Sequence, residues 1–118
     1  MRTVGVIAFL GTPCLLAPEK GSKLASEIKR QLQAEHSVRV DFDGYEFLSS
    51  AFLNHAFGQI CIDQNMETSV FHESILIVNM TEDDMEELEL ALDNAQTRRV
   101  LINRGHNPDQ YYSSRLPV

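Results

Sequence analysis

The sequence predicts an α/β fold, a single domain with a mixed, mainly parallel sheet of about four or five strands and about three helices. Three observations support this prediction. A length of 118 residues fits one domain. Hydrophobic residues make up 43% and charged residues 23%, as in ordinary globular chains. Short β-branched apolar runs alternate with amphipathic stretches of helical length, which is typical of parallel sheets covered by helices. We place the domain at residues 1–102 and a polar C-terminal tail at residues 103–118.

The first elements are two short apolar runs. Residues 4–10 and residues 14–17 are separated by a Gly-Thr-Pro break at 11–13. Each run has the length of a strand, whereas a membrane span needs about 20 residues. We therefore predict strand, turn and strand at the N-terminus rather than a signal peptide.

A helix is predicted over residues 18–33, because apolar residues recur there at three- and four-residue spacing. These are Leu24, Ala25, Ile28 and Leu32. Residues 37–42 alternate apolar and polar side chains, which is typical of a strand. Asp43 and Gly44 then form a turn, and residues 45–48 form a short extended run.

A second helix begins at Ser49 or Ser50 and ends near Gln64, with a wide apolar face that predicts burial. Residues 75–78 form a continuous apolar run, as expected for a central strand covered on both faces.

Thr81 caps a third helix, with Asp84 three residues further on. Residues 100–102 are then expected to form a last edge strand. The tail after them carries Tyr111 and Tyr112.

Charge and cysteine content narrow the classes of function. Lys and Arg number 10 against 17 Asp and Glu, a net charge of −7, which disfavours nonspecific binding to nucleic acid or anionic lipid. We expect no membrane-spanning segment. Cys14 and Cys61 cannot form a disulfide framework, so we expect ordinary buried thiols in a reducing cytoplasm. No spacing typical of a metal, cofactor or catalytic site is present, so we expect none of these and no enzymatic activity.

One segment carries a family resemblance. A strand ends in Asp41-Phe42, and a Phe47-Leu48-Ser49-Ser50 element follows a turn. The next helix has the pattern Phe52 to Phe57-Gly58. Together these residues resemble the STAS-like domain family of unknown function, and the resemblance covers roughly residues 12–97. It implies a single STAS-like domain.

That family is distantly similar to bacterial STAS domains, which include the anti-sigma factor antagonists. In those domains an Asp-Ser-Ser-Gly element opens the equivalent helix, and its first Ser is phosphorylated by a partner kinase. The resemblance puts Ser49 at the Asp position and Ser50 at the phosphoacceptor position, while Ala51 and Phe52 replace the last two residues. It implies a non-enzymatic, protein-binding regulatory module of a bacterial signalling pathway. The implied partner is a histidine-kinase-like ATPase or an anti-sigma-like regulator.

The predicted contact surface comprises Ser50, Ser49, Asp43, Glu46 and Asn54. Capping of the helix is the commonest role of Ser at a helix start, and this interpretation stays open beside the phosphoserine switch.

Two other functions also stay open. One is a constitutive assembly module, such as a homodimer, in which Ser50 is only a cap. The other is a small-ligand or nucleotide sensor that holds an anion at Lys20, Gly21, Ser22 and Lys23, at the start of the first helix. Asp41 and Asp43 fall on the same side of a strand, but we favour turn chemistry there over a metal or acid–base pair.

Overall fold

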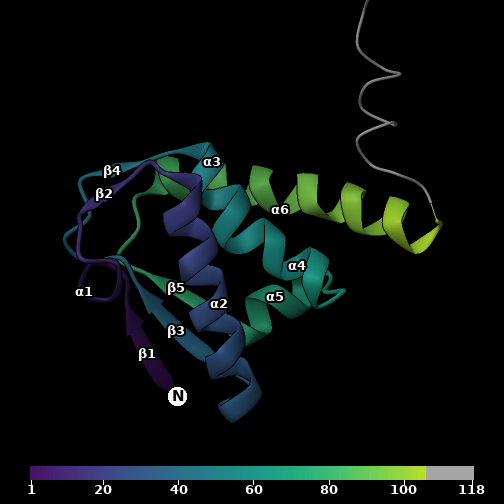
Figure 1. The fold of residues 1–118 in the computed structure, drawn as a ribbon, viewed down its shortest axis with the longest axis horizontal. Coiled ribbons are helices and arrows are strands. Elements are labelled where there is room, and N and C mark those ends of the chain that lie inside the picture. Colours follow the sequence, from purple (N-terminus) through teal and green to yellow (C-terminus); the bar gives the residue numbers. More distant parts are fainter. Residues whose placement is uncertain (106–118) are drawn as a thin grey trace, which may run out of the picture.

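The computed structural model describes residues 1–105 and shows a small α/β fold (Figure 1). Within those residues a three-stranded sheet has the order β1-β3-β5 and is parallel throughout. Its strands are β1 (Arg2–Gly5), β3 (Val38–Asp41) and β5 (Ile75–Val78). A separate two-stranded parallel sheet joins β2 (Cys14–Leu15) to β4 (Phe47–Leu48). The predicted α/β class is confirmed, but the strands form two sheets rather than one mixed sheet.

The larger sheet has one buried and one exposed face. Val4, Val38 and Val40 are buried, whereas Thr3 and Arg39, which alternate with them, are exposed. Leu76 lies beside Arg39 in the register and is 44% exposed. The prediction of a central strand covered on both faces at residues 75–78 is therefore wrong. Strand β5 is an edge strand, and the side chain of Leu76 lies on the face of the sheet that is exposed to solvent.

The predicted strand over residues 4–10 is also wrong in its second half. The strand ends at Gly5, which is the N-cap of helix α1 (Val6–Leu10). Val6 and Leu10 are buried four residues apart, which is a helical spacing. Gly11 ends the helix with a φ of 74°, and its N–H donates to the carbonyl of Ile7 at 2.8 Å. Glycine adopts this left-handed conformation without steric cost, so it allows the short helix to end there.

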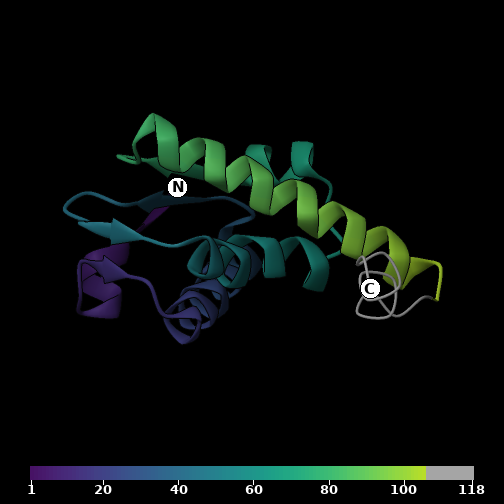
Figure 2. The same ribbon diagram turned by 90° about the horizontal axis from the view of Figure 1, so that it is seen from above.

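The helical layer contains the predicted first helix, α2 (Pro18–Glu35), and a continuous second helix in three parts. The parts are α3 (Ser50–Leu53), a π-helical turn η1 (Asn54–Gly58) and α4 (Gln59–Asp63). Helix α6 (Glu82–Asn103) packs against this second helix from the side opposite α2 (Figures 1 and 2). The second helix is thus held between α2 and α6.

Two differences concern the C-terminal half. Helix α5 (Thr68–Ser74) precedes β5 and was not predicted. Residues 100–102 are not a strand but the last turn of α6, because the helical hydrogen bonds continue to the N–H of Arg104. The predicted tail begins inside this helix, at Asn103, and its residues 106–118, including Tyr111 and Tyr112, lie outside the described residues.

The core lies between the sheet and the helices. Phe42 at the end of β3 contacts Phe57 of η1, with ring centroids 6.0 Å apart. Phe57 contacts Phe71 of α5 edge to face at 5.8 Å. All three side chains are fully buried. The second helix therefore contributes the aromatic side chain that bridges the end of β3 to α5, as its wide apolar face predicted.

Candidate functional site

The start of α3 is built by two serines with different roles. Ser49 is the N-cap, and its Oγ accepts a hydrogen bond from the N–H of Phe52 at 3.0 Å. The same hydroxyl donates to the carbonyl of Leu16 at 2.9 Å, and the Ser49 N–H donates to the carbonyl of Leu15 at 3.0 Å. These backbone contacts occupy the hydroxyl of Ser49 and tie α3 to β2, so capping explains this residue.

Ser50 lies at the surface. It is the first residue of α3 and is exposed. Its hydroxyl donates to the Oε2 of Glu87 on α6 at 3.1 Å, and Glu87 is also exposed. This hydrogen bond spans 37 residues of sequence and joins the N-terminal part of α3 to the first half of α6. A reagent or a partner can therefore approach the hydroxyl from solvent.

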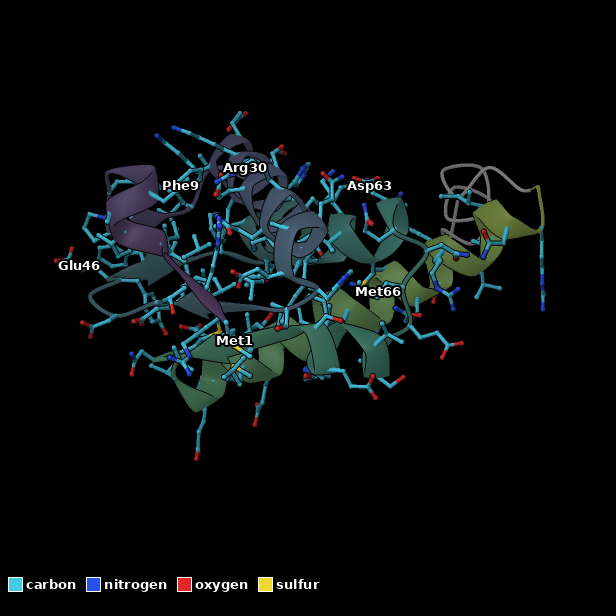
Figure 3. The ribbon with its side chains drawn as sticks, turned by 90° about the horizontal axis from the view of Figure 1, so that it is seen from below. Met1, Phe9, Arg30, Glu46, Asp63 and Met66 are labelled. Atoms are coloured by element: carbon cyan, nitrogen blue, oxygen red, sulfur yellow. The ribbon has the colours of Figure 1, made fainter. Side chains whose placement is uncertain are left out.

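Asp43 and Glu46 are exposed in the segment before α3. Figure 3 shows Glu46 at the same end of the molecule as Phe9 of α1. The N–H of Asp43 donates to Oδ1 of Asp41 at 2.9 Å, and Nδ2 of Asn79 donates to the same oxygen at 2.8 Å. The bonds from Asn79 and from the Asp43 N–H hold the pKa of Asp41 below its usual range. The Asp41 carboxylate therefore stabilises the turn that follows β3 and links it to the residue that follows β5, as we predicted for an Asp residue at a turn.

Sequence reasoning missed Tyr45. Its hydroxyl donates to Oδ2 of Asp84 at 2.5 Å and accepts a hydrogen bond from the N–H of Thr81 at 3.1 Å. Thr81 caps α6 as predicted, because its Oγ1 accepts from the N–H of Asp84 at 3.2 Å. Tyr45 therefore fixes the segment before β4 to the start of α6. Its partners are 36 and 39 residues away, and local spacing carries no signal for such contacts.

An exposed apolar patch adjoins the Ser50 corner. Phe47 is 59% exposed and Leu16 is 48% exposed. Phe47 pairs in register with Cys14, whose exposure contradicts the prediction of two buried thiols. Cys61 is buried, and burial raises the pKa of its thiol to about 11. We call Cys14, Leu16 and Phe47 the apolar patch.

Three of the four residues predicted to hold an anion serve the packing of α2. Nζ of Lys20 donates to the carbonyl of Leu10 at 3.5 Å, and Nζ of Lys23 lies 5.5 Å from the ring centroid of Phe9. Gly21 is buried against the second helix, while Ser22 is exposed. Both ammonium groups are thus directed towards α1 and do not form a cradle with Gly21.

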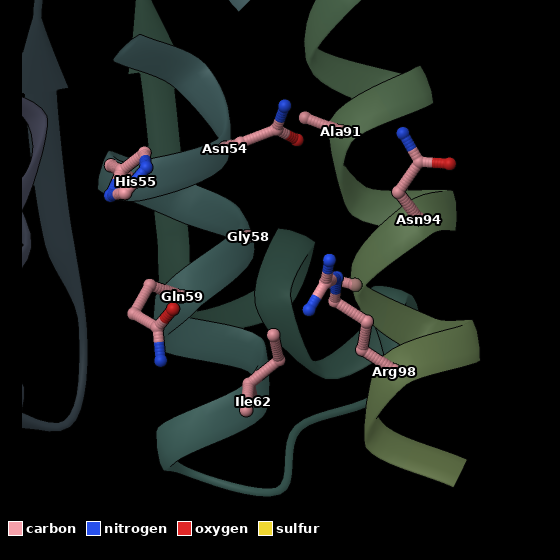
Figure 4. Close-up of a pocket in the computed structure, with 9 residues that line it drawn as sticks. Asn54, His55, Gly58, Gln59, Ile62, Ala91, Asn94 and Arg98 are labelled. Atoms are coloured by element: carbon pink, nitrogen blue, oxygen red, sulfur yellow. The ribbon is translucent and has the colours of Figure 1, made fainter. Parts of the chain in front are cut away.

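Asn54 lies one helical turn beyond Ser50, on the same face of the second helix. There it lines a groove of about 520 Å³ between the second helix and α6 (Figure 4). The groove is lined by Asn54, His55, Gly58, Gln59, Ile62, Ala91, Asn94, Ala95 and Arg98. The structure therefore places Asn54 in a second surface feature, which sequence reasoning did not foresee because two distant helices form it.

Among residues 1–105, no group of three His, Cys, Asp or Glu side chains is placed to hold a metal ion. Within the same range, no helix has both the length and the apolar character that crossing a bilayer requires.

A small parallel sheet with helices on one face, and a serine-capped helix that follows a second, two-stranded sheet, define a small α/β domain. The chain belongs to the family described as STAS-like domain of unknown function (DUF4325), whose sequence model matches residues 20–85. The match runs from α2 into the first turn of α6 and includes the Ser49–Ser50 corner. The resemblance seen in the sequence is confirmed. Searches of curated proteins and of solved structures gave no significant match.

Proposed function

We propose that this chain is a non-enzymatic regulatory module of a bacterial signalling pathway and binds another protein through the surface around Ser50. One observation carries the proposal. The Ser50 hydroxyl is exposed, and it bonds the exposed side chain of Glu87 instead of the backbone of its own helix. A serine that served only as a cap would resemble Ser49, whose hydroxyl is occupied by backbone groups.

The surroundings of Ser50 suit a protein partner. The apolar patch lies beside the start of α3, because the Ser49 hydroxyl donates a hydrogen bond to the carbonyl of Leu16. Asp43, Glu46 and Glu87 add exposed negative charge near this segment. Interfaces commonly combine an apolar centre with a charged rim. The partner that fits has an apolar contact residue and, opposite Ser50, a neutral or acidic group that accepts the unmodified serine.

Phosphorylation of Ser50 would change this surface strongly. It would replace a hydroxyl donor by a group of nearly two negative charges, 3.1 Å from where Glu87 now accepts a hydrogen bond. Like charges at that separation repel, so the bond between α3 and α6 would be lost. A partner that docks on the unmodified surface would then dissociate. By resemblance, the kinase or partner is a histidine-kinase-like ATPase or an anti-sigma-like regulator.

The test starts with co-purification of the tagged full chain from its native host, followed by mass spectrometry of bound proteins and of Ser50. The binding of the identified partner is then measured with Ser50→Asp, Ser50→Ala and Phe47→Ser. We expect Ser50→Asp and Phe47→Ser each to weaken binding by about tenfold or more, because one adds like charge and the other removes apolar contact. Ser50→Ala should bind nearly as well as the wild type.

Ser22→Asp is the matched control. Ser22 is an exposed serine on α2, so this variant makes the same chemical change away from the proposed surface. It should leave partner binding unchanged. Equal binding by wild type, Ser50→Asp and Phe47→Ser would contradict the proposal. A stable dimer in light scattering that survives Ser50→Asp, with no other protein co-purified, would instead favour a constitutive assembly module.

A further inference from the structure

The groove between the second helix and α6 differs in charge from the rest of the chain. None of the nine described residues that line it is acidic, although the chain carries a net charge of −7. Arg98 supplies a guanidinium group and His55 an imidazole ring. The nearby carboxylate of Asp63 accepts hydrogen bonds from Lys29 at 2.9 Å and from Gln59 at 2.8 Å. The groove is therefore lined by basic and neutral residues on an acidic domain.

Both polar and apolar groups line this groove. In Figure 4 the Arg98 guanidinium reaches from α6 into the space between the helices, and the Asn54 amide reaches from η1 towards α6. The rest of the lining includes small or apolar residues, namely Gly58, Ile62, Ala91 and Ala95. An arginine fork suits carboxylate or phosphate oxygens, and neighbouring amides can donate further hydrogen bonds to them. The small residues leave room for an apolar part of a ligand.

The π-helical turn gives a second and independent indication. Asn54, His55 and Gly58, all in η1, line the groove. Single π-helical turns within α-helices are rare and frequently occur at functional sites. In this chain the irregular turn coincides with the groove and not with the Ser50 corner. The volume of about 520 Å³ lies in the range of small-molecule sites.

We infer that this groove binds a small organic anion, with its carboxylate or phosphate group on Arg98 and its apolar part over Ile62 and Ala95. The ligand would be of metabolite size, since the groove is bounded by two helices and about two turns of each. The Asn54 amide would hydrogen-bond the anionic group from the opposite side. This binding function does not depend on the proposed role of Ser50.

Amide chemical-shift titrations of the full chain test the inference with defined probes. Benzoate and phenyl phosphate supply the two anionic groups on one ring, benzamide is the neutral analogue of benzoate, and inorganic phosphate lacks an apolar part. We expect saturable shifts in η1, α4 and the second half of α6 with benzoate or phenyl phosphate. Benzamide and inorganic phosphate should bind more weakly by about tenfold or more.

Three variants link such binding to the groove. Arg98→Gln removes the charge, and Asn54→Asp places a carboxylate on an exposed helix position while leaving Arg98 intact. Each should raise the Kd of the anion about tenfold or more. Arg104→Gln, an equal charge change on an exposed residue beyond the groove, should leave the Kd unchanged. The inference is overturned if no anion saturates at millimolar concentration, if benzamide binds as well as benzoate, or if both groove variants bind like the wild type.

Discussion

Gly21 marks the closest approach of α2 to the second helix, and replacing it by alanine is expected to destabilise the fold. A Cβ at this position would lie 2.6 Å from the carbonyl oxygen of Phe52 and 3.1 Å from the N of Ala56. It would also lie 3.1 Å from the Cβ of His55. The two closest atoms belong to the backbone, so no side chain can rotate away. Because ordinary contacts begin at 3.4 Å, the helices would have to separate by several tenths of an ångström.

Two opposing terms set the magnitude for Gly21→Ala. Alanine in a helix interior is favoured over glycine by about 0.5–1 kcal/mol. Overpacking of a close contact costs about 1–3 kcal/mol, and rigid backbone neighbours place this case at the upper end. The net loss is therefore about 1–2 kcal/mol, equivalent to a fall in Tm of roughly 4–8 °C for a domain of this size.

Gly58→Ala is the matched control, because it is the same change in a neighbouring helix. There the Cβ would lie 3.4 Å from the carbonyl oxygen of Ala91 and 3.5 Å from the Cβ of Ala95, which are ordinary contacts. We expect this variant to be neutral or more stable by about 0.5–1 kcal/mol. Urea unfolding followed by far-UV circular dichroism measures both values. The reasoning is refuted if Gly21→Ala is as stable as the wild type, or if Gly58→Ala is the more damaging change.

Three further predictions concern single side chains. Tyr45→Phe removes the hydroxyl that joins the start of α6 to the segment before β4, so it should lower the free energy of unfolding by about 1–2 kcal/mol in urea titrations. Asn79 helps to hold the pKa of Asp41 below its usual range in the folded protein. The ionised Asp41 carboxylate therefore stabilises the fold at any pH above the pKa that Asp41 has in the unfolded chain. This stabilisation is lost as the pH falls through the lower pKa that Asp41 has in the folded protein. Asp41→Asn should therefore reduce the loss of stability below about pH 4, and unchanged pH dependence would contradict this. Exposed Cys14 should react with a thiol reagent in the native protein, whereas buried Cys61, with a pKa of about 11, should react only after unfolding.

The sequence predicted best those elements whose signals are local. Ser49 and Thr81 mark helix starts because their hydroxyls bond backbone N–H groups three residues further on. The apolar stripe of α2 predicted its buried face. Residues 100–102 were misassigned because a short apolar run fits a strand and a helix equally well. The extension of α6 through Asn103 decides between them, and three residues are too few to show a helical period.

The candidate site depended on contacts that local patterns do not contain. Spacing alone could not tell whether Ser49 or Ser50 was the cap, and the structure separates them by their partners. The partner of Ser50, Glu87, is 37 residues away on α6, and local spacing carries no signal for such a contact. The groove was missed for the same reason, since Asn54 and Arg98 come from different helices.

Helix α6 contributes residues to both proposed surfaces, with acidic residues near Ser50 and a basic residue in the groove. Its first turn holds Glu82, Asp83 and Asp84, and Glu87 contacts Ser50, whereas Arg98 lies further along the helix in the groove. A rise of about 1.5 Å per residue puts Asn54, which lines the groove, about 6 Å along the helix from Ser50. Two unit charges at that separation in water interact by about 0.7 kcal/mol, and salt screening roughly halves this energy, so a charge added at Ser50 should change the field in the groove little. Ser50→Asp should leave the affinity for benzoate within about twofold of the wild type, because twofold corresponds to only about 0.4 kcal/mol. A larger change in a folded variant would mean that the two ends of α6 are mechanically coupled, because screened charge alone would not produce it.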